Sequence, residues 1–223
     1  MKLYLSSQKL GLFPNMLKNL VGDNLNVVVI ANALDDQTEE YRNDRVKKEF
    51  QMLKLVGLNP EELDLRDYFG KGEQLRKYLK TKSLIWIRGG NTFILSRAIN
   101  ASGFDKEILP LIKDGTIAYG GYSASLLLAS KDLLGTEIVD DPYSVPNGYP
   151  KSDCNFESLH LLDFYLIPHF NNTDEWAKNV RKHVEYLLNN KKKVVTLNDG
   201  EVYYCNGKKG KILKWMKKNE LKN

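Results

Sequence analysis

The chain has 223 residues, of which 42% are hydrophobic and 27% are charged, and this composition is typical of a globular protein. Its 33 basic and 28 acidic residues leave a net charge of +5, and much of the excess lies in Lys191–Lys193 and the C-terminal tail. We interpret these as solvated segments, because no aromatic side chains alternate with basic ones as in a nucleic-acid-binding face. No apolar run reaches the roughly 18 residues that a membrane span needs. We therefore expect one domain over residues 1–223, with no membrane partner.

The cysteines and the first residues bear on the compartment. Cys154 and Cys205 have no neighbouring cysteines or histidines at metal-binding spacing, and two cysteines imply no disulfide framework. The apolar stretch at the N-terminus is broken by polar residues after Leu5, which is too early for a signal peptide. We expect a cytoplasmic protein with reduced thiols and no metal site.

Short apolar runs alternate with helical patterns through the first 130 residues. The expected strands are 3–6, 26–32, 62–65, 83–90 and 116–121, and the expected helices are about 37–56 and 72–80. Strands that are apolar throughout and separated by helices are typical of a parallel sheet covered on both faces. We therefore predict an α/β fold, a three-layer α/β/α sandwich with a mostly parallel sheet.

The pattern changes after about residue 131. Residues 135–158 form a polar segment with three prolines, and segments of this length in compact domains usually carry a function or lack order. An apolar run that ends at Pro168 and His169 predicts a further strand, and 174–190 has a helical pattern. The remaining residues predict short strands joined by Asn-Asp-Gly and Asn-Gly turns.

A tight bend follows the strand at 116–121, where residues 121–125 read Gly-Tyr-Ser-Ala-Ser. The pattern Gly-x-Ser-x-Gly between a strand and a helix is a nucleophile elbow, whose glycines allow a strained turn that exposes the serine hydroxyl. The start of the following helix, at Ala124, also offers free N–H groups to a developing oxyanion. The alternative is that Ser123 caps the helix. The motif alone leaves both interpretations open.

A second glycine bend follows the strand at 83–90, where Arg88 is followed by Gly-Gly-Asn-Thr. Gly89 or Gly90 can direct a backbone N–H into the crevice at the carboxyl edge of the sheet, where open α/β sheets bind ligands. The alternative is a simple turn in which Asn91 or Thr92 caps the next helix. The two interpretations are compatible.

A serine hydroxyl needs a neighbouring base, and the chain has three histidines. His183 lies among charged neighbours in a helical segment, so we expect it on the surface, and His160 begins a strand. His169 follows what we take as a central strand, so we place it at the same sheet edge as Ser123. Asp199, which follows the apolar run 194–197, is the candidate to orient the imidazole, although its Asn-Asp-Gly context is also that of an ordinary turn.

In chain order, Gly-Gly-Asn-Thr, Gly-x-Ser-Ala, Ile-Pro-His-Phe and Leu-Asn-Asp-Gly resemble peptidase family S51, the peptidase E group with its cyanophycinase relatives. The order Ser, His, acid differs from the Ser, acid, His order of α/β-hydrolases. The resemblance implies a class I glutamine amidotransferase-like (flavodoxin-like) fold and a serine peptidase that cleaves short peptides without a metal or organic cofactor. It implies these roles: nucleophile Ser123, base His169, acid Asp199, and an oxyanion hole from Ala124 with Gly90 or Gly89.

The sequence departs from the family pattern at positions that affect specificity. Ser125 replaces a glycine, and Asp199 stands where glutamate is more frequent. The family's aspartyl dipeptidases have an acidic residue downstream of the serine, and Asp140 and Asp141 lie in that region as candidates to bind a substrate's free amino group. Lys178 stands where an arginine would bind an aspartate side chain, and a lysine cannot form the bidentate clamp.

Dipeptide hydrolysis by a monomer or homodimer is therefore the main hypothesis. One alternative is the same fold acting on another amide, an isopeptide or an ester. A second is a non-catalytic homologue that binds a ligand at the serine bend. A third is a nucleic-acid-binding module, which the basic tail suggests and which would bind with a strong dependence on salt; we expect no nucleic-acid partner.

Overall fold

A computed structural model describes residues 1–151 and 156–215, so Cys154 and the end of the basic tail lie outside the described residues. The main sheet has seven strands in the order β3-β2-β4-β5-β1-β8-β9. The first five in this order run parallel, whereas β8 is antiparallel to β1 and β9 is antiparallel to β8. The strands are β1 (Lys2–Ser6), β2 (Asn26–Ile30), β3 (Asn59–Glu62), β4 (Leu84–Ile87), β5 (Ala118–Tyr122), β8 (Val202–Asn206) and β9 (Gly210–Leu213).

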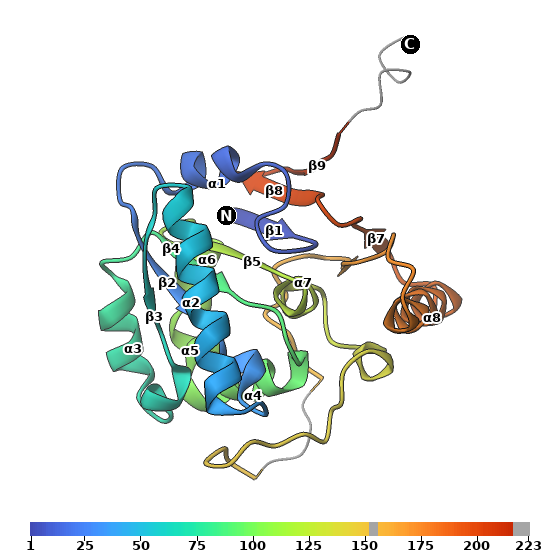
Figure 1. Ribbon diagram of the computed structural model, residues 1–223, viewed down its shortest axis with the longest axis horizontal. Coiled ribbons are helices and arrows are strands. Elements are labelled where there is room, and N and C mark those ends of the chain that lie inside the picture. The colour runs from blue at the N-terminus through green and yellow to red at the C-terminus, as the bar shows by residue number, and fades with distance from the viewer. Residues whose placement is uncertain (152–155, 216–223) are drawn as a thin grey trace.

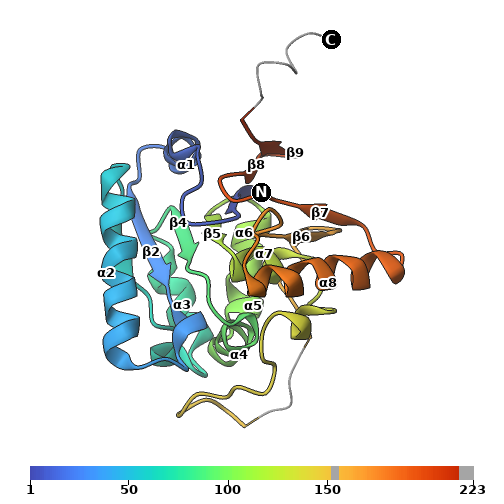
Figure 2. The same cartoon turned by 45° about the vertical axis from the view of Figure 1, so that its right-hand side comes forward.

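Helices cover both faces of this sheet, which confirms the three-layer α/β/α sandwich (Figure 2). Side chains alternate between the faces along each strand, so Val27 and Val29 pack into one layer while Val28 and Ile30 pack into the other. The first layer contains α1 (Pro14–Val21) and α2 (Glu39–Leu55). The second contains α3 (Gly72–Leu79), α4 (Thr92–Ser102), α5 (Phe104–Glu107), α6 (Leu109–Lys113) and α7 (Ala124–Ala129). No helix of residues 1–151 and 156–215 is long and apolar enough to cross a membrane.

A smaller unit lies beside α7, at the right of Figure 1. It consists of β6 (Tyr165–Ile167) and β7 (Val194–Thr196), which pair in parallel, and of α8 (Glu175–Asn189) between them. The expectation that the strand before His169 belongs to the central sheet is therefore wrong. An apolar run indicates that a strand is buried, but it does not indicate which strand pairs with it. Here the partner is β7, which is distant in sequence.

The strand expected at 62–65 is also displaced. β3 ends at Glu62, and residues 65–68 form the 3₁₀-helix η2 (Leu65–Tyr68). Asp64 causes the change of conformation, because its side chain accepts a hydrogen bond from the backbone N–H of Arg66 and so caps η2. Two further 3₁₀-helices are η1 (Asn32–Leu34), after β2, and η3 (Thr136–Ile138), in the long polar segment.

The parallel strands all point their carboxyl ends toward one edge of the main sheet. Ser7 follows β1, Gly89 follows β4, and Ser123 follows β5 at that edge. These three strands are adjacent in the order β4-β5-β1. The topology therefore gathers both glycine and serine bends at the place where α/β sheets bind ligands.

Candidate active site

Ser123 occupies a strained bend between β5 and α7. Its φ of 56° and ψ of −110° lie outside the regions that non-glycine residues favour, and such strain costs about 1–3 kcal/mol. Gly121 makes the bend possible, because a Cβ at this residue would collide with the carbonyl oxygen of Ile87. The Ser123 side chain makes no capping hydrogen bond to α7, so the alternative that this serine caps the helix is wrong.

Buried side chains next to the bend fix its position through hydrogen bonds and packing. The hydroxyl of Tyr122 donates to the buried carboxyl of Glu49 at 2.6 Å, and the indole N–H of Trp86 donates to the same group at 3.1 Å. Burial raises the pKa of Glu49. Ser125, which replaces the family's glycine, is fully buried behind the bend, and its Oγ has no hydrogen-bond partner within the described residues. The side chain at this position therefore packs behind the bend, close to Gly121.

The Gly89-Gly90 turn lies directly against Ser123. A Cβ on Gly89 would stand 2.7 Å from the Cβ of Ser123, and a Cβ on Gly90, whose φ is 157°, would collide with the carbonyl oxygen of Ala33. Both positions therefore require glycine. Asn91 caps α4 as expected, because its Oδ1 accepts from the N–H groups of Phe93 and Ile94 at 2.8 and 3.2 Å.

His169 and Asp199 form a pair. The distance from His169 Nδ1 to Asp199 Oδ1 is 2.7 Å, and the two side chains are only 9% and 18% exposed. His169 has a positive φ of 60°, and its ring packs edge-on against Trp176 with centroids 5.4 Å apart. Asn171 accepts from the Asp199 N–H at 2.8 Å and so fixes the Asn-Asp-Gly turn. A carboxylate on Nδ1 sets the imidazole tautomer and leaves Nε2 available as a base.

Ser7 is a positioning residue that the sequence analysis missed. Its Oγ donates to Asp199 Oδ1 at 2.7 Å and accepts from the backbone N–H of His169 at 2.8 Å. This fully buried serine thus ties the carboxylate and the strained backbone of His169 to the end of β1. The only signal in the sequence is a polar residue directly after a buried strand.

A cavity of about 270 Å³ adjoins Ser123 and Gly90. Pro168 and Trp176, which flank His169, line the same cavity, so the serine bend and the segment of the histidine share one concave surface. The remaining walls come from α7, β6, α8 and the residues after η3. Asp140 and His183 contribute the ionisable side chains of the lining.

His183 lines this cavity, so its expected place on the surface is wrong. It is only 1% exposed, because it lies on the face of α8 that also buries Val180, Val184 and Leu187. Its Nε2 donates to the carbonyl oxygen of Leu134 at 3.1 Å, while Nδ1 has no partner within the described part of the chain. Burial lowers the pKa of His183, so the ring is neutral near pH 7. The helical period of the apolar positions is the signal that identifies it.

The three weaker candidates for substrate binding separate in the structure. Asp140 lines the cavity, and its Oδ2 accepts from the N–H of Thr92 at 2.9 Å, while burial raises the pKa of its carboxyl. Asp141 is exposed and caps its own loop by accepting from the Tyr143 N–H at 2.9 Å. Lys178 is 58% exposed, pairs with Glu175 at 2.7 Å, and is not part of the cavity lining.

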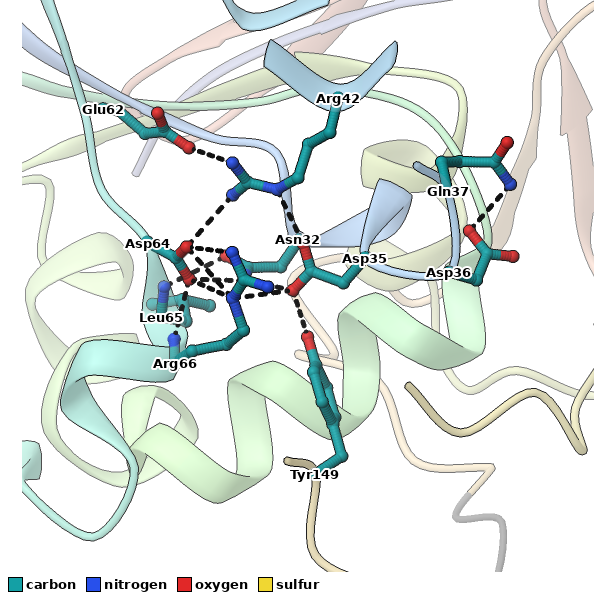
Figure 3. Close-up of polar contacts among 10 residues, drawn as sticks. All are labelled: Asn32, Asp35, Asp36, Gln37, Arg42, Glu62, Asp64, Leu65, Arg66 and Tyr149. Carbon is teal, nitrogen blue, oxygen red and sulfur yellow. Dashed lines mark hydrogen bonds and ion pairs between the residues drawn. The ribbon is translucent and has the colours of Figure 1, made fainter. Parts of the chain in front are cut away.

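A charged network that the sequence analysis did not predict lies farther along the same sheet edge (Figure 3). Arg42 of α2 pairs with Asp35 at 2.8 Å and with Asp64 at 3.3 Å. The other contacts of the network join Arg42 to Glu62 at 2.6 Å, Arg66 to Asp64 at 2.5 Å, Asn32 to Asp35 at 2.7 Å, and Tyr149 to Asp35 at 2.6 Å. Tyr149 belongs to the long polar segment, so the network ties that segment to the ends of β2 and β3. The sequence contains these residues but no spacing that brings them together.

Comparisons with known proteins agree with this fold. The model of peptidase family S51 matches residues 5–213. An uncharacterized peptidase of Listeria monocytogenes is 28% identical over 197 residues, which cover 88% of this chain and 89% of that protein. Peptidase E of Actinobacillus pleuropneumoniae is 26% identical over 148 residues, which cover 64% of this chain and 59% of that protein.

A solved structure shows the same fold over nearly the whole chain. The crystal structure of a candidate peptidase E from Listeria monocytogenes superposes with a TM-score of 0.76 at 26% identity, covering 96% of this chain and 98% of that one. The chain belongs to peptidase family S51, and it is a serine-type peptidase. The resemblance seen in the sequence motifs is thereby confirmed.

Proposed function

We infer that this chain hydrolyses short peptides through a triad of Ser123, His169 and Asp199. The observation that carries the proposal is the 2.7 Å contact between His169 and Asp199, in a segment that shares a cavity with the strained Ser123 bend. Whole-ligand sites usually have volumes of about 300–1,000 Å³. The cavity of about 270 Å³ therefore favours a small part of a short peptide.

The acylation step uses each of these residues. Ser123 Oγ forms a bond to the carbonyl carbon of the substrate while its proton passes to His169 Nε2. The resulting oxyanion accepts hydrogen bonds from the backbone N–H of Gly90 or Gly89 and from that of Ala124, whose position at the start of α7 leaves it without a helical partner. Each such donor contributes about 3–4 kcal/mol where one has been removed.

The reaction then proceeds through an acyl-enzyme. His169 gives the proton to the leaving amine as the C–N bond breaks, and water then attacks the ester with His169 again as the base. Asp199 holds the imidazole and stabilises its charged form, and Ser7 holds Asp199. Asp140 faces the same cavity, and we assign it to the free amino group of the substrate, whose positive charge favours the ionised carboxyl.

A serine-directed fluorophosphonate probe and two serine variants test this proposal. We expect the probe to label Ser123 in the native protein. We expect Ser123→Ala to lower kcat for peptide hydrolysis by about 10⁴- to 10⁶-fold, because the triad acts as a unit. Ser125→Ala, in the same motif, is the matched control. It removes a buried hydroxyl that has no hydrogen-bond partner within the described residues, so it should keep both labelling and hydrolysis. Hydrolysis by Ser123→Ala at the wild-type rate would show that the assignment is wrong.

A further inference from the structure

The walls of the cavity beside Ser123 are mainly apolar. Six of the lining residues have no charged or strongly polar side-chain group: Leu127, Val139, Ile167, Pro168, Trp176 and Val180. They come from α7, β6, α8 and the connecting segments, so the lining is built by several elements that pack together. Burial of a substrate side chain against such walls is favourable in proportion to its apolar area.

The lining that the structure describes has no cationic side chain that would hold an acidic one. Among the residues that the structure describes, no lysine or arginine lines the cavity. The neutral ring of His183 has one N–H, and its Nε2 donates this hydrogen to the carbonyl oxygen of Leu134, so the ring has no second hydrogen to donate to a carboxylate. Asp140 is itself an acid, and Lys178 is turned to solvent in its pair with Glu175. A carboxylate buried here would lose its hydration without a compensating partner.

We propose that this cavity takes the apolar side chain of the residue whose carbonyl Ser123 attacks, so that the enzyme prefers peptides with an apolar residue there over aspartyl peptides. The inference rests on the proposed function of Ser123. Ser123 and Gly90 form part of the cavity wall. A residue whose carbonyl group binds between them therefore has the cavity beside it. With Asp140 at the amino group, the substrate is a short peptide with an apolar N-terminal residue.

Hydrolysis of a series of aminoacyl p-nitroanilides by the full chain tests the preference directly. The acyl residue alone changes in the series leucine, methionine, alanine and aspartate. We expect kcat/KM for the leucine compound to exceed that for the aspartate compound by at least about 100-fold, because a buried carboxylate has no partner here. We expect kcat/KM for leucine to exceed that for alanine by about 10-fold, because additional buried methylene groups contribute only a few kcal/mol. The dipeptides Leu-Ala and Ala-Leu then show which residue enters the cavity, and we expect Leu-Ala to be the better substrate.

A charge placed in the wall sharpens the test. Val139 is half-buried at the cavity, so a longer side chain there is compatible with folding. We expect Val139→Arg to raise the ratio of aspartate to leucine kcat/KM by at least about 10-fold, because it supplies the missing cation. Val139→Met controls for length without charge. Val145→Arg is the matched control in the same segment, because Val145 is 42% exposed and does not line the cavity.

The outcomes distinguish this inference from the function on which it rests. Fluorophosphonate labelling of Ser123 together with the leucine preference and its shift in Val139→Arg supports the inference. Labelling of Ser123 without a preference for apolar acyl residues, or with a preference for Ala-Leu over Leu-Ala, overturns the inference and leaves the proposed triad. Absence of both labelling and hydrolysis overturns the proposed function, and the inference with it.

Discussion

Two polar clusters lie at the same edge of the main sheet, and their interactions differ. In the network around Arg42, both arginines and all three carboxylates have an ion-pair partner, and the buried Asp35 also accepts from Asn32 and Tyr149 (Figure 3). The cluster around Ser123 contains two residues with positive φ, Ser123 and His169, and a nitrogen of neighbouring His183 that has no hydrogen-bond partner among residues 1–151 and 156–215.

The difference shows how one sheet edge combines a rigid support with a reactive site. The network pairs each of its charged side chains with an opposite charge, and it joins β2, β3 and the long polar segment. The carbonyl oxygen of Ala33, between these residues and the site, accepts the N–H of Asn91 at 2.8 Å and so connects η1 to the turn at Gly90. The strained bend at Ser123 is therefore connected through η1 to an ion-paired network, and strained residues at functional sites generally require such support from their surroundings.

The largest expected effect is on catalysis. We expect Asp199→Asn to lower kcat by about 10⁴-fold, because an amide favours the wrong imidazole tautomer while it preserves the shape of the side chain. Steady-state hydrolysis of a short peptide measures the effect. Asp163→Asn serves as the control, since Asp163 is 80% exposed and pairs only loosely with Lys193 at 3.5 Å. A kcat within tenfold of the wild type would exclude Asp199 as the third member of the triad.

The next largest effect is on stability, in the paired cluster. We expect Arg42→Ala to lower the free energy of unfolding by about 3–5 kcal/mol, because it leaves the buried Asp35 with fewer compensating partners. Urea denaturation measures the change. Lys48→Ala, on the same helix, removes an exposed pair with Asp44 and should cost less than about 1 kcal/mol. Equal losses in the two variants would contradict the structural role assigned to the network.

Backbone strain at Ser123 predicts a smaller difference between two inactive variants. Ser123→Gly should be more stable than Ser123→Ala by about 1 kcal/mol, because relief of the strain outweighs the extra chain entropy that glycine loses on folding. At Ser130, where φ is −66°, the order should reverse. Thermal or urea unfolding of the four variants measures both differences. A glycine variant less stable than its alanine counterpart at position 123 would mean that the bend is not strained.

The pH dependence of stability should have opposite signs in the two clusters. Burial alone would raise the pKa of Asp64, but hydrogen bonds from Arg66 and Asn32 outweigh it and lower the pKa, whereas burial raises the pKa of Asp140. The stabilising contribution of Asp64 is therefore present above its unfolded pKa and is lost as pH falls through the lower folded pKa. Asp140 lowers stability as pH rises from its unfolded pKa through the raised folded one.

Paired variants measure these signs. Relative to the wild type, Asp64→Asn should lose more stability at pH 7 than at pH 3. The stability of Asp140→Asn relative to the wild type should increase as the pH rises from 4 to 7. The change is about 1.4 kcal/mol for each unit by which the pKa is displaced. Urea unfolding at pH 3, 5 and 7 gives both slopes. Parallel slopes in the two variants would mean that the two carboxyls have similar surroundings.

Local patterns in the sequence predicted much of this molecule. Continuously apolar runs predicted strands such as β2, β4 and β5, and the small residues around Ser123 predicted a tight bend, which the structure shows to be strained. These features depend on steric limits between residues that are close in sequence, so the local order of residues is enough to predict them. The motifs that follow one another along the chain also indicated the family.

Tertiary packing alone decided the rest. It paired β6 with β7 outside the main sheet, brought Ser7 to Asp199, and turned His183 into the cavity while it left Lys178 in solvent. Each of these outcomes is a contact between residues far apart in sequence, or a choice of helix face made by the neighbour that covers it. A local spacing indicates which face of a helix is buried, as the apolar period of α8 does for His183, but it does not name the partner, because the free energy of these contacts comes from burial and pairing that exist only once the layers have packed together.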